Sequence, residues 1–215
     1  MTNHYSLFTV IVNITGVTTT DPETIEVHYQ SIFPETDYIQ NRVLVEISGR
    51  SMNEPIENAQ INSMISQVYP DAPFADKPFT IRAVSPKRTF IEKAFLLHEE
   101  FAKEGENIRI NRMSRHIYDL EKLMDTPIAK EALADTELYK SVIEHRQKFI
   151  GLKGMDYATL LPQTISFVPP PSIIGLWRDD YSSMQSSMIY GGSLSFDDLI
   201  VRIKELNEQF REIKI

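Results

Sequence analysis

The hydrophobic pattern of this 215-residue chain changes at residue 85. Before that point, short runs of β-branched and aromatic residues are interrupted by Gly, Pro, Asp and Asn, as is typical of β-strands. In the run 42–49, the alternate positions from Val43 to Ile47 are apolar and share one face, whereas Glu46 stands on the other. The pattern predicts strands within 7–12, 24–33, 42–49 and 79–84, and a short helix within 53–72 that ends before Pro70.

From residue 85 onward the apolar positions recur at helical spacing. Ser85 suits an N-cap and Pro86 the first helical position, and an apolar stripe then runs from Phe90 to Phe101. Further helices are predicted within 111–125, 137–150 and 178–189, with a proline-bearing connection at 160–175 and a last helix from Ser195, where Asp198 completes a capping-box pattern. The predicted fold class is α+β, with a strand-rich domain at 1–84 and a helical domain at 85–215.

Composition restricts the class of protein. The 42% hydrophobic and 24% charged content is that of an ordinary globular protein, no run approaches the roughly 18 apolar residues of a membrane helix, and the N-terminus lacks the basic region of a signal peptide. The absence of cysteine excludes disulfides and thiolate sites and is compatible with the cytoplasm. The net charge of −8 argues against a whole-surface nucleic-acid binder, although residues 82–122 hold nine basic and seven acidic residues.

Two positions in the helical half are candidates for chemistry. Lys93 falls about 60° from Phe90 around the helix, so it can keep its stem at the core edge and point its ammonium into a cleft or into water. Asp119 follows Arg115 by four residues, a spacing at which the two can simply form a surface ion pair.

Other polar residues have a structural and a functional interpretation. Glu46 is either a solvent-facing strand residue or a functional carboxylate. His98 and His116 lie near apolar stripes and are interpreted as packed or hydrogen-bonded histidines, and no His pair has a convincing metal spacing.

Two stretches carry a resemblance to a known family: "RTFIEKAFLLHEEF" at 88–101 and "RMSRHIYDLEKL" at 112–123. An Arg-x-x-x-Glu-Lys helix followed some twenty-odd residues later by Tyr-Asp-Leu resembles the AbiEii/AbiGii-type nucleotidyltransferase toxins. Supporting similarity lies in "VLVEISGRSMNEPIE" at 43–57 and "DYSSMQSSMIYGGSLSFDDLI" at 180–200. Together these stretches cover most of the chain from about Arg42 onward.

The resemblance implies a nucleotidyltransferase-like palm with a mixed sheet, followed by a helical region. It implies a toxin of a bacterial toxin–antitoxin or phage-defence (abortive infection) system, held by a cognate antitoxin, that uses Mg²⁺ and transfers nucleotides from an NTP to an RNA acceptor such as tRNA. It makes Lys93 the triphosphate contact and Asp119 the acid that completes the active centre. It adds Arg88 and Arg115 as nucleotide-binding positions and Glu46 as a further catalytic carboxylate. Lys93 and Asp119 are then expected side by side.

The sequence departs from this family at its beginning. The Gly-Gly-Thr/Ser turn and Asp-x-Asp strand should precede 42–49, but Gly16 is the only glycine among the first forty residues and no Asp-x-Asp occurs in the chain. The chain is expected to correspond to the C-terminal two-thirds of a member, with an incomplete metal site and weak or no transferase activity alone. The alternatives are a non-catalytic nucleotide- or antitoxin-binding remnant, or RNA binding through Arg112 and Arg115.

A Gly-Gly-Ser followed by two aspartates does occur at 190–199, but the pattern does not fit the chemistry. Asp197 and Asp198 are adjacent, so on a strand they would face opposite sides. A loop followed by a helix N-terminus accounts for every residue, because acidic groups suit the first turn of a helix.

Overall fold

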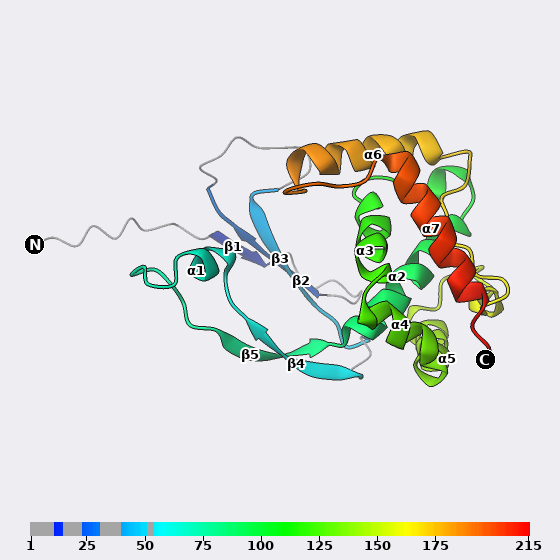
Figure 1. Cartoon of the computed structure of the whole chain (residues 1–215), viewed down its shortest axis with the longest axis horizontal. Coiled ribbons are helices and arrows are strands. Elements are labelled where there is room, and N and C mark those ends of the chain that lie inside the picture. Colours follow the sequence, from blue (N-terminus) through cyan, green and yellow to red (C-terminus); the bar gives the residue numbers. More distant parts are fainter. Residues whose placement is uncertain (1–10, 15–22, 31–39, 51–53) are drawn as a thin grey trace, which may run out of the picture.

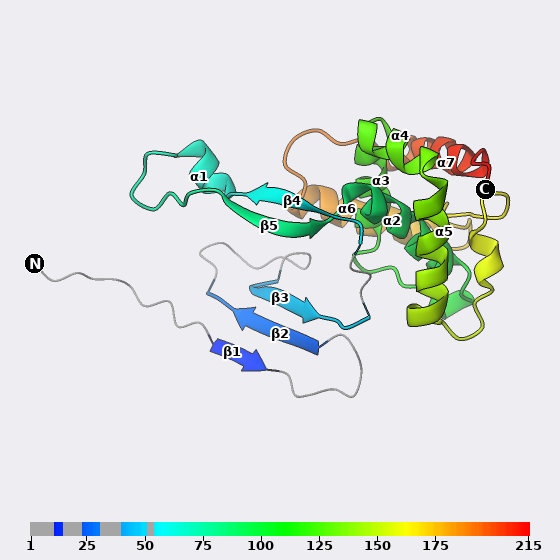
Figure 2. The ribbon, with the colours of Figure 1, turned by 90° about the horizontal axis from the view of Figure 1, so that it is seen from below.

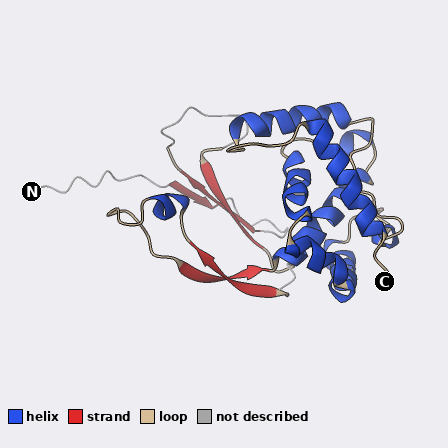
Figure 3. Cartoon of the chain, in the orientation of Figure 1, coloured by secondary structure: helices blue, strands red, loops and turns tan. Residues whose placement is uncertain are grey.

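The computed structural model describes residues 11–14, 23–30, 40–50 and 54–215. Its strands lie at one end of the molecule and its long helices gather at the other (Figures 1 and 3). Parts of the predicted strands 7–12 and 24–33 fall outside the described residues. The α+β class predicted from the sequence is confirmed, since the described residues form two small antiparallel sheets and a set of helices.

The described strands form two small sheets. The first has the order β1-β2-β3, and the second is a two-stranded ribbon of β4 and β5. Figure 2 shows the two as separate layers, with the short helix α1 at the far end of the ribbon. The strands are β1 Ile11–Ile14, β2 Glu23–His28, β3 Arg42–Ile47, β4 Ile56–Ile61 and β5 Phe79–Val84, and α1 spans Met64–Val68.

Every described strand pairing is antiparallel, whereas the resemblance implied a mixed sheet. A parallel pair needs a crossover connection, usually a helix of ten residues or more, and within the described parts of the strand region the one helix is the five-residue α1. The short helix before Pro70 is confirmed, but β4 was not predicted. Its polar residues Glu57, Asn58 and Gln60 hide the strand pattern, since the ribbon leaves all three exposed to solvent.

The helical part follows directly after β5. Pro86 opens α2 as expected, although the Ser85 side chain makes no capping hydrogen bond. The Ser195 side chain does cap α7: its Oγ accepts from the Asp198 N–H at 3.2 Å, which confirms the predicted capping pattern. The helices are α2 Pro86–Phe101, α3 Ser114–Met124, α4 Pro127–Ala134, α5 Thr136–His145, α6 Ile174–Ser187 and α7 Phe196–Arg211.

The hydrophobic core lies among these helices. The Phe210 ring packs against Phe90 and Phe167 at centroid distances of 5.6 and 5.0 Å, and buried Trp177 packs edge-on against Phe101 at 5.0 Å. By contrast, Val43 on β3 remains 54% exposed. Among the described residues, no helix is long and apolar enough to cross a membrane. The division at residue 85 into two domains stays a prediction.

Candidate functional site

The central pair of the predicted site is formed between two consecutive helices. The Lys93 Nζ on α2 donates a hydrogen bond to the Asp119 Oδ2 on α3 at 2.6 Å. The two side chains are 22% and 41% exposed, so the pair lies at the surface of the α2–α3 contact rather than in the core. The structure therefore brings together the two residues that the resemblance placed side by side.

The apolar stripes of the two helices explain this meeting. Phe90, Ala94 and Leu97 of α2 are fully buried, as are Ile117 and Leu120 of α3. Lys93 is at the border of the α2 stripe, about 60° from Phe90, whereas Asp119 is turned about 100° from Leu120, outside the α3 stripe. Because the stripes pack against the same core, the flank of α3 that carries Asp119 comes within reach of the long Lys93 side chain, and the two polar ends meet at the surface.

His116 lies one turn before Asp119 on α3, at the edge of the same contact. Its Nδ1 atom is buried without a hydrogen-bond partner among the described residues. Burial, reinforced by the positive charges of Lys93 and Arg115, lowers the pKa of His116 to about 3. The imidazole is therefore neutral at pH 7. From the sequence, His116 was interpreted as a packed or hydrogen-bonded histidine, and a buried ring nitrogen without a hydrogen-bond partner was not expected.

His98 is the hydrogen-bonded histidine that the sequence suggested. Its Nδ1 accepts from the Ser166 N–H at 2.9 Å and its Nε2 lies 2.9 Å from the Thr159 Oγ1. Burial is the main cause that lowers the pKa of His98. The ring joins α2 to the connection that precedes α6, so we assign it a structural role.

The two predicted flanking arginines differ in exposure. Arg115 is exposed one turn before Asp119, and within the described part of the chain it forms no ion pair with that residue, which bonds Lys93 instead. Arg88 is only 4% exposed, and its Nε donates to the Glu92 Oε1 at 3.1 Å. Lys93 comes five positions after Arg88, which turns their side chains about 140° apart around α2. Arg115 is therefore better placed than Arg88 to meet a ligand at Lys93.

Glu46 lies on a different element from the central pair. It is exposed on β3, opposite Thr24 of β2. Within the described ranges it makes no hydrogen bond or ion pair with Lys93 or Asp119. Its assignment as a further catalytic carboxylate stays a prediction.

The described residues do not fit a magnesium ion. None of the His, Asp and Glu side chains in the described ranges form a group of three that could hold a metal. Asp119 supplies one carboxylate, and an ammonium already contacts it. Mg²⁺ prefers several oxygen ligands in octahedral geometry, so no step of the function below is assigned to a metal.

The Gly-Gly-Ser segment with its two aspartates is structural, as expected. Asp197 forms a bidentate pair with Arg178, at 2.7 and 3.0 Å. Asp198 accepts a hydrogen bond from the Ser195 hydroxyl at 2.6 Å. The two carboxylates therefore stabilise the first turn of α7, one through Arg178 and the other through Ser195.

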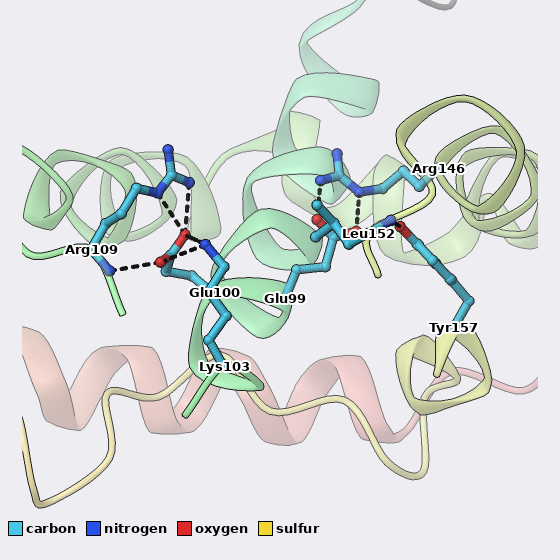
Figure 4. Close-up of polar contacts among 7 residues, drawn as sticks. All are labelled: Glu99, Glu100, Lys103, Arg109, Arg146, Leu152 and Tyr157. Atoms are coloured by element: carbon cyan, nitrogen blue, oxygen red, sulfur yellow. Dashed lines mark hydrogen bonds and ion pairs between the residues drawn. The ribbon is translucent and has the colours of Figure 1, made fainter. Parts of the chain in front are cut away.

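Two buried glutamates near the end of α2 were not singled out from the sequence (Figure 4). Glu99 accepts two hydrogen bonds from Arg146, and Glu100 accepts from the backbone and side chain of Arg109 at 2.7 Å and from Lys103 at 2.9 Å. Burial alone would raise the pKa of Glu100, but the bonds from Arg109 and Lys103 outweigh it and the pKa is lowered. Adjacent residues on a helix point about 100° apart, so Glu99 and Glu100 bind different arginines, Arg146 and Arg109.

The geometry defines an α+β protein with a cation–carboxylate pair at the surface between two consecutive helices of its helical part. Residues 4–202 match the family described as nucleotidyl transferase AbiEii toxin, type IV toxin–antitoxin system. Since the match spans most of the 215 residues, the chain belongs to this family. No curated protein matches the chain, and no solved structure does. Membership in a toxin–antitoxin family implies an antitoxin partner.

Proposed function

We propose that this chain binds the triphosphate of an NTP over the Lys93–Asp119 pair and that, alone, it transfers nucleotides weakly or not at all. The observation that carries the proposal is the 2.6 Å hydrogen bond between the two side chains. The bond joins the two stretches on which the sequence resembles the nucleotidyl transferase family that the chain belongs to. Phosphoryl transfer depends mainly on positioning and charge neutralisation, and a surface ammonium beside a carboxylate can contribute to both.

The pair can receive a phosphate without being broken. A lysine ammonium has three N–H donors and no acceptor, so the bond to Asp119 leaves donors for phosphate oxygens. Arg115 adds an exposed guanidinium one turn away on α3, a group that binds phosphate oxygens in a fork. Neutral His116 adds no charge of its own at pH 7. Arg88 and Glu46 remain proposed contributors, the first buried on α2 and the second exposed on β3.

The weak activity follows from the composition of the site. Transfer to an RNA acceptor such as tRNA needs charge stabilisation at the leaving pyrophosphate and activation of the acceptor. The sequence contains no Asp-x-Asp, and among the described residues Asp119 is the one carboxylate bonded to Lys93. We place this activity in the bacterial cytoplasm, within a phage-defence system.

A label-transfer assay tests the proposal. The purified chain is incubated with labelled NTPs, Mg²⁺ and an RNA pool, beside the variant Lys93→Ala and the control Lys87→Ala, a lysine of α2 that pairs with Glu131 and Asp135. We expect label incorporation near background. Robust transfer that Lys93→Ala abolishes would refute the inactivity but support the site, and robust transfer that survives Lys93→Ala would refute both.

A second candidate function is antitoxin binding without chemistry. The observation that favours it is the exposure of β3, where Val43, Leu44, Val45 and Ile47 are 42–54% exposed although they alternate between the two faces of the sheet. Large exposed apolar patches mark interaction sites. If the antitoxin covers β3, Val43→Lys will abolish co-elution with the cognate antitoxin in gel filtration. Val201→Lys on α7, which is 53% exposed, serves as the matched control. Co-elution unchanged by Val43→Lys would reject this surface.

A further inference from the structure

A buried carboxylate on α6 holds the beginning of α3. The Asp180 Oδ1 accepts from the Arg112 N–H at 2.6 Å, and its Oδ2 accepts from the N–H and the hydroxyl of Ser114 at 2.9 and 2.5 Å. Asp180 is 9% exposed and Ser114 is fully buried. Figure 1 shows α6 lying across α3. A side chain 66 residues away in the sequence therefore caps this helix.

The start of α3 depends on this carboxylate because its own sequence supplies no cap. The N-cap position is Met113, which makes no side-chain capping bond. The first N–H groups of a helix lack intrahelical partners and favour a negative charge. Arg112 also has a φ of 60°, a left-handed conformation that is unfavourable for a residue other than glycine. The N–H of this strained residue donates to Asp180, which stabilises the turn into α3.

The position of Asp180 is in turn fixed by the core. Trp177, Tyr181 and Met184 form the buried stripe of α6, and Asp180 lies beside that stripe, next to Tyr181. The carboxylate is thereby directed at α3 from a helix whose rotation is set by three large side chains. Movement of Asp180 would need displacement of that stripe.

We propose that Asp180 is a positioning residue for the site between α2 and α3. By fixing the first residues of α3, it sets the rotation at which Asp119, five residues after Ser114, meets Lys93. The inference rests on the proposed function, because the Lys93–Asp119 pair matters for activity only if it binds the triphosphate. Asp180 lies outside the stretches 88–101 and 112–123 that carry the family resemblance, yet the geometry of the Lys93–Asp119 pair depends on it.

The test observes the Lys93–Asp119 hydrogen bond directly, without nucleotide. The ¹⁵Nζ resonance of Lys93 is measured by NMR in selectively lysine-labelled protein and assigned by its absence in Lys93→Arg. Asp119→Asn gives the resonance position of the pair without its carboxylate. The test variant is Asp180→Asn, which replaces one acceptor oxygen by an NH₂ donor. The control is Asp179→Asn, which removes the exposed neighbouring charge.

In folded Asp180→Asn, we expect the Lys93 resonance to move to its position in Asp119→Asn, while Asp179→Asn keeps the wild-type position. If Asp180→Asn does not fold, Ser114→Ala removes only the hydroxyl donor, and a partial move in the same direction is expected. A Lys93 resonance that stays at the wild-type position in the folded variant would overturn the proposal and leave Asp180 as a helix cap alone. Failure of NTP binding by the wild type would instead refute the proposed function without changing this result.

Discussion

The neutral His116 predicts a specific loss of stability in mild acid. In the folded protein the pKa of His116 is lowered to about 3, chiefly by burial, whereas an unfolded histidine has a pKa of about 6.5. Between these two values the unfolded chain binds a proton that the folded chain does not. The free energy of unfolding therefore falls as the pH falls through this window, and the penalty is absent above pH 7.

The magnitude follows from the two pKa values. Between pH 7 and pH 5, proton binding to the unfolded histidine lowers the free energy of unfolding by about 2 kcal/mol. This number depends almost entirely on the unfolded pKa, because at pH 5 the folded His116 is still neutral. A loss of this size is a large fraction of the roughly 5–15 kcal/mol of an ordinary domain.

The assay is urea unfolding of wild type and His116→Gln at pH 8, 7 and 5. Glutamine removes the titrating ring, so the variant should lose about 2 kcal/mol less than the wild type between pH 7 and pH 5. Carboxylates and His98 titrate in both proteins and cancel in the difference. Between pH 8 and pH 7 the two proteins should change by the same amount to within a few tenths of a kcal/mol. Equal losses from pH 7 to pH 5 would refute the neutral state of the half-buried His116.

Three further predictions concern stability at pH 7, measured by urea unfolding. Glu99→Gln breaks the buried pair with Arg146 and should cost about 3–5 kcal/mol, since it leaves an uncompensated buried charge, whereas Glu137→Gln, in an exposed pair with Lys140, should stay within about 0.5 kcal/mol. Ser195→Ala removes the cap of α7 and should cost about 1 kcal/mol. Phe210→Ala empties the centre of the aromatic core and should cost about 3–5 kcal/mol.

Each of these has an outcome that contradicts it. Equal effects of the Glu99 and Glu137 variants would mean that the Glu99–Arg146 pair is not desolvated. An unchanged midpoint for Ser195→Ala would show that α7 does not depend on its cap. A Phe210→Ala protein within 1 kcal/mol of wild type would place the core elsewhere.

The helical half could be predicted because its signals are local. The stripes of α2 and α3 follow the 3.6-residue period, which was enough to predict both helices. The Lys93–Asp119 contact between them was expected from the family resemblance of the two stretches that carry these residues. Ser195 and Asp198 lie three residues apart, and this local capping pattern predicted the start of α7.

The missed features depend on distant partners or on weak local patterns. The carboxylate of Asp180 reaches α3 across 66 residues, and the Arg146 guanidinium reaches Glu99 across 47, so single-sequence periodicity could not reveal either. The eight-residue α4 was not predicted because it is short and follows directly after α3. The antiparallel pairing of β1, β2 and β3 could not be predicted either, because the register of a strand depends on its partner strands and not on its own sequence pattern.

The central claim is that the Lys93 ammonium, held beside Asp119, receives the triphosphate of an NTP. Isothermal titration calorimetry of an NTP into wild type, Lys93→Met and the matched control Lys87→Met measures it most directly. Hydrogen bonds to charged groups contribute about 1.5–3 kcal/mol, so the account predicts a Kd raised roughly 10- to 150-fold in Lys93→Met and unchanged in Lys87→Met. Equal Kd values for wild type and Lys93→Met, or an NTP that does not bind the wild type, would contradict it.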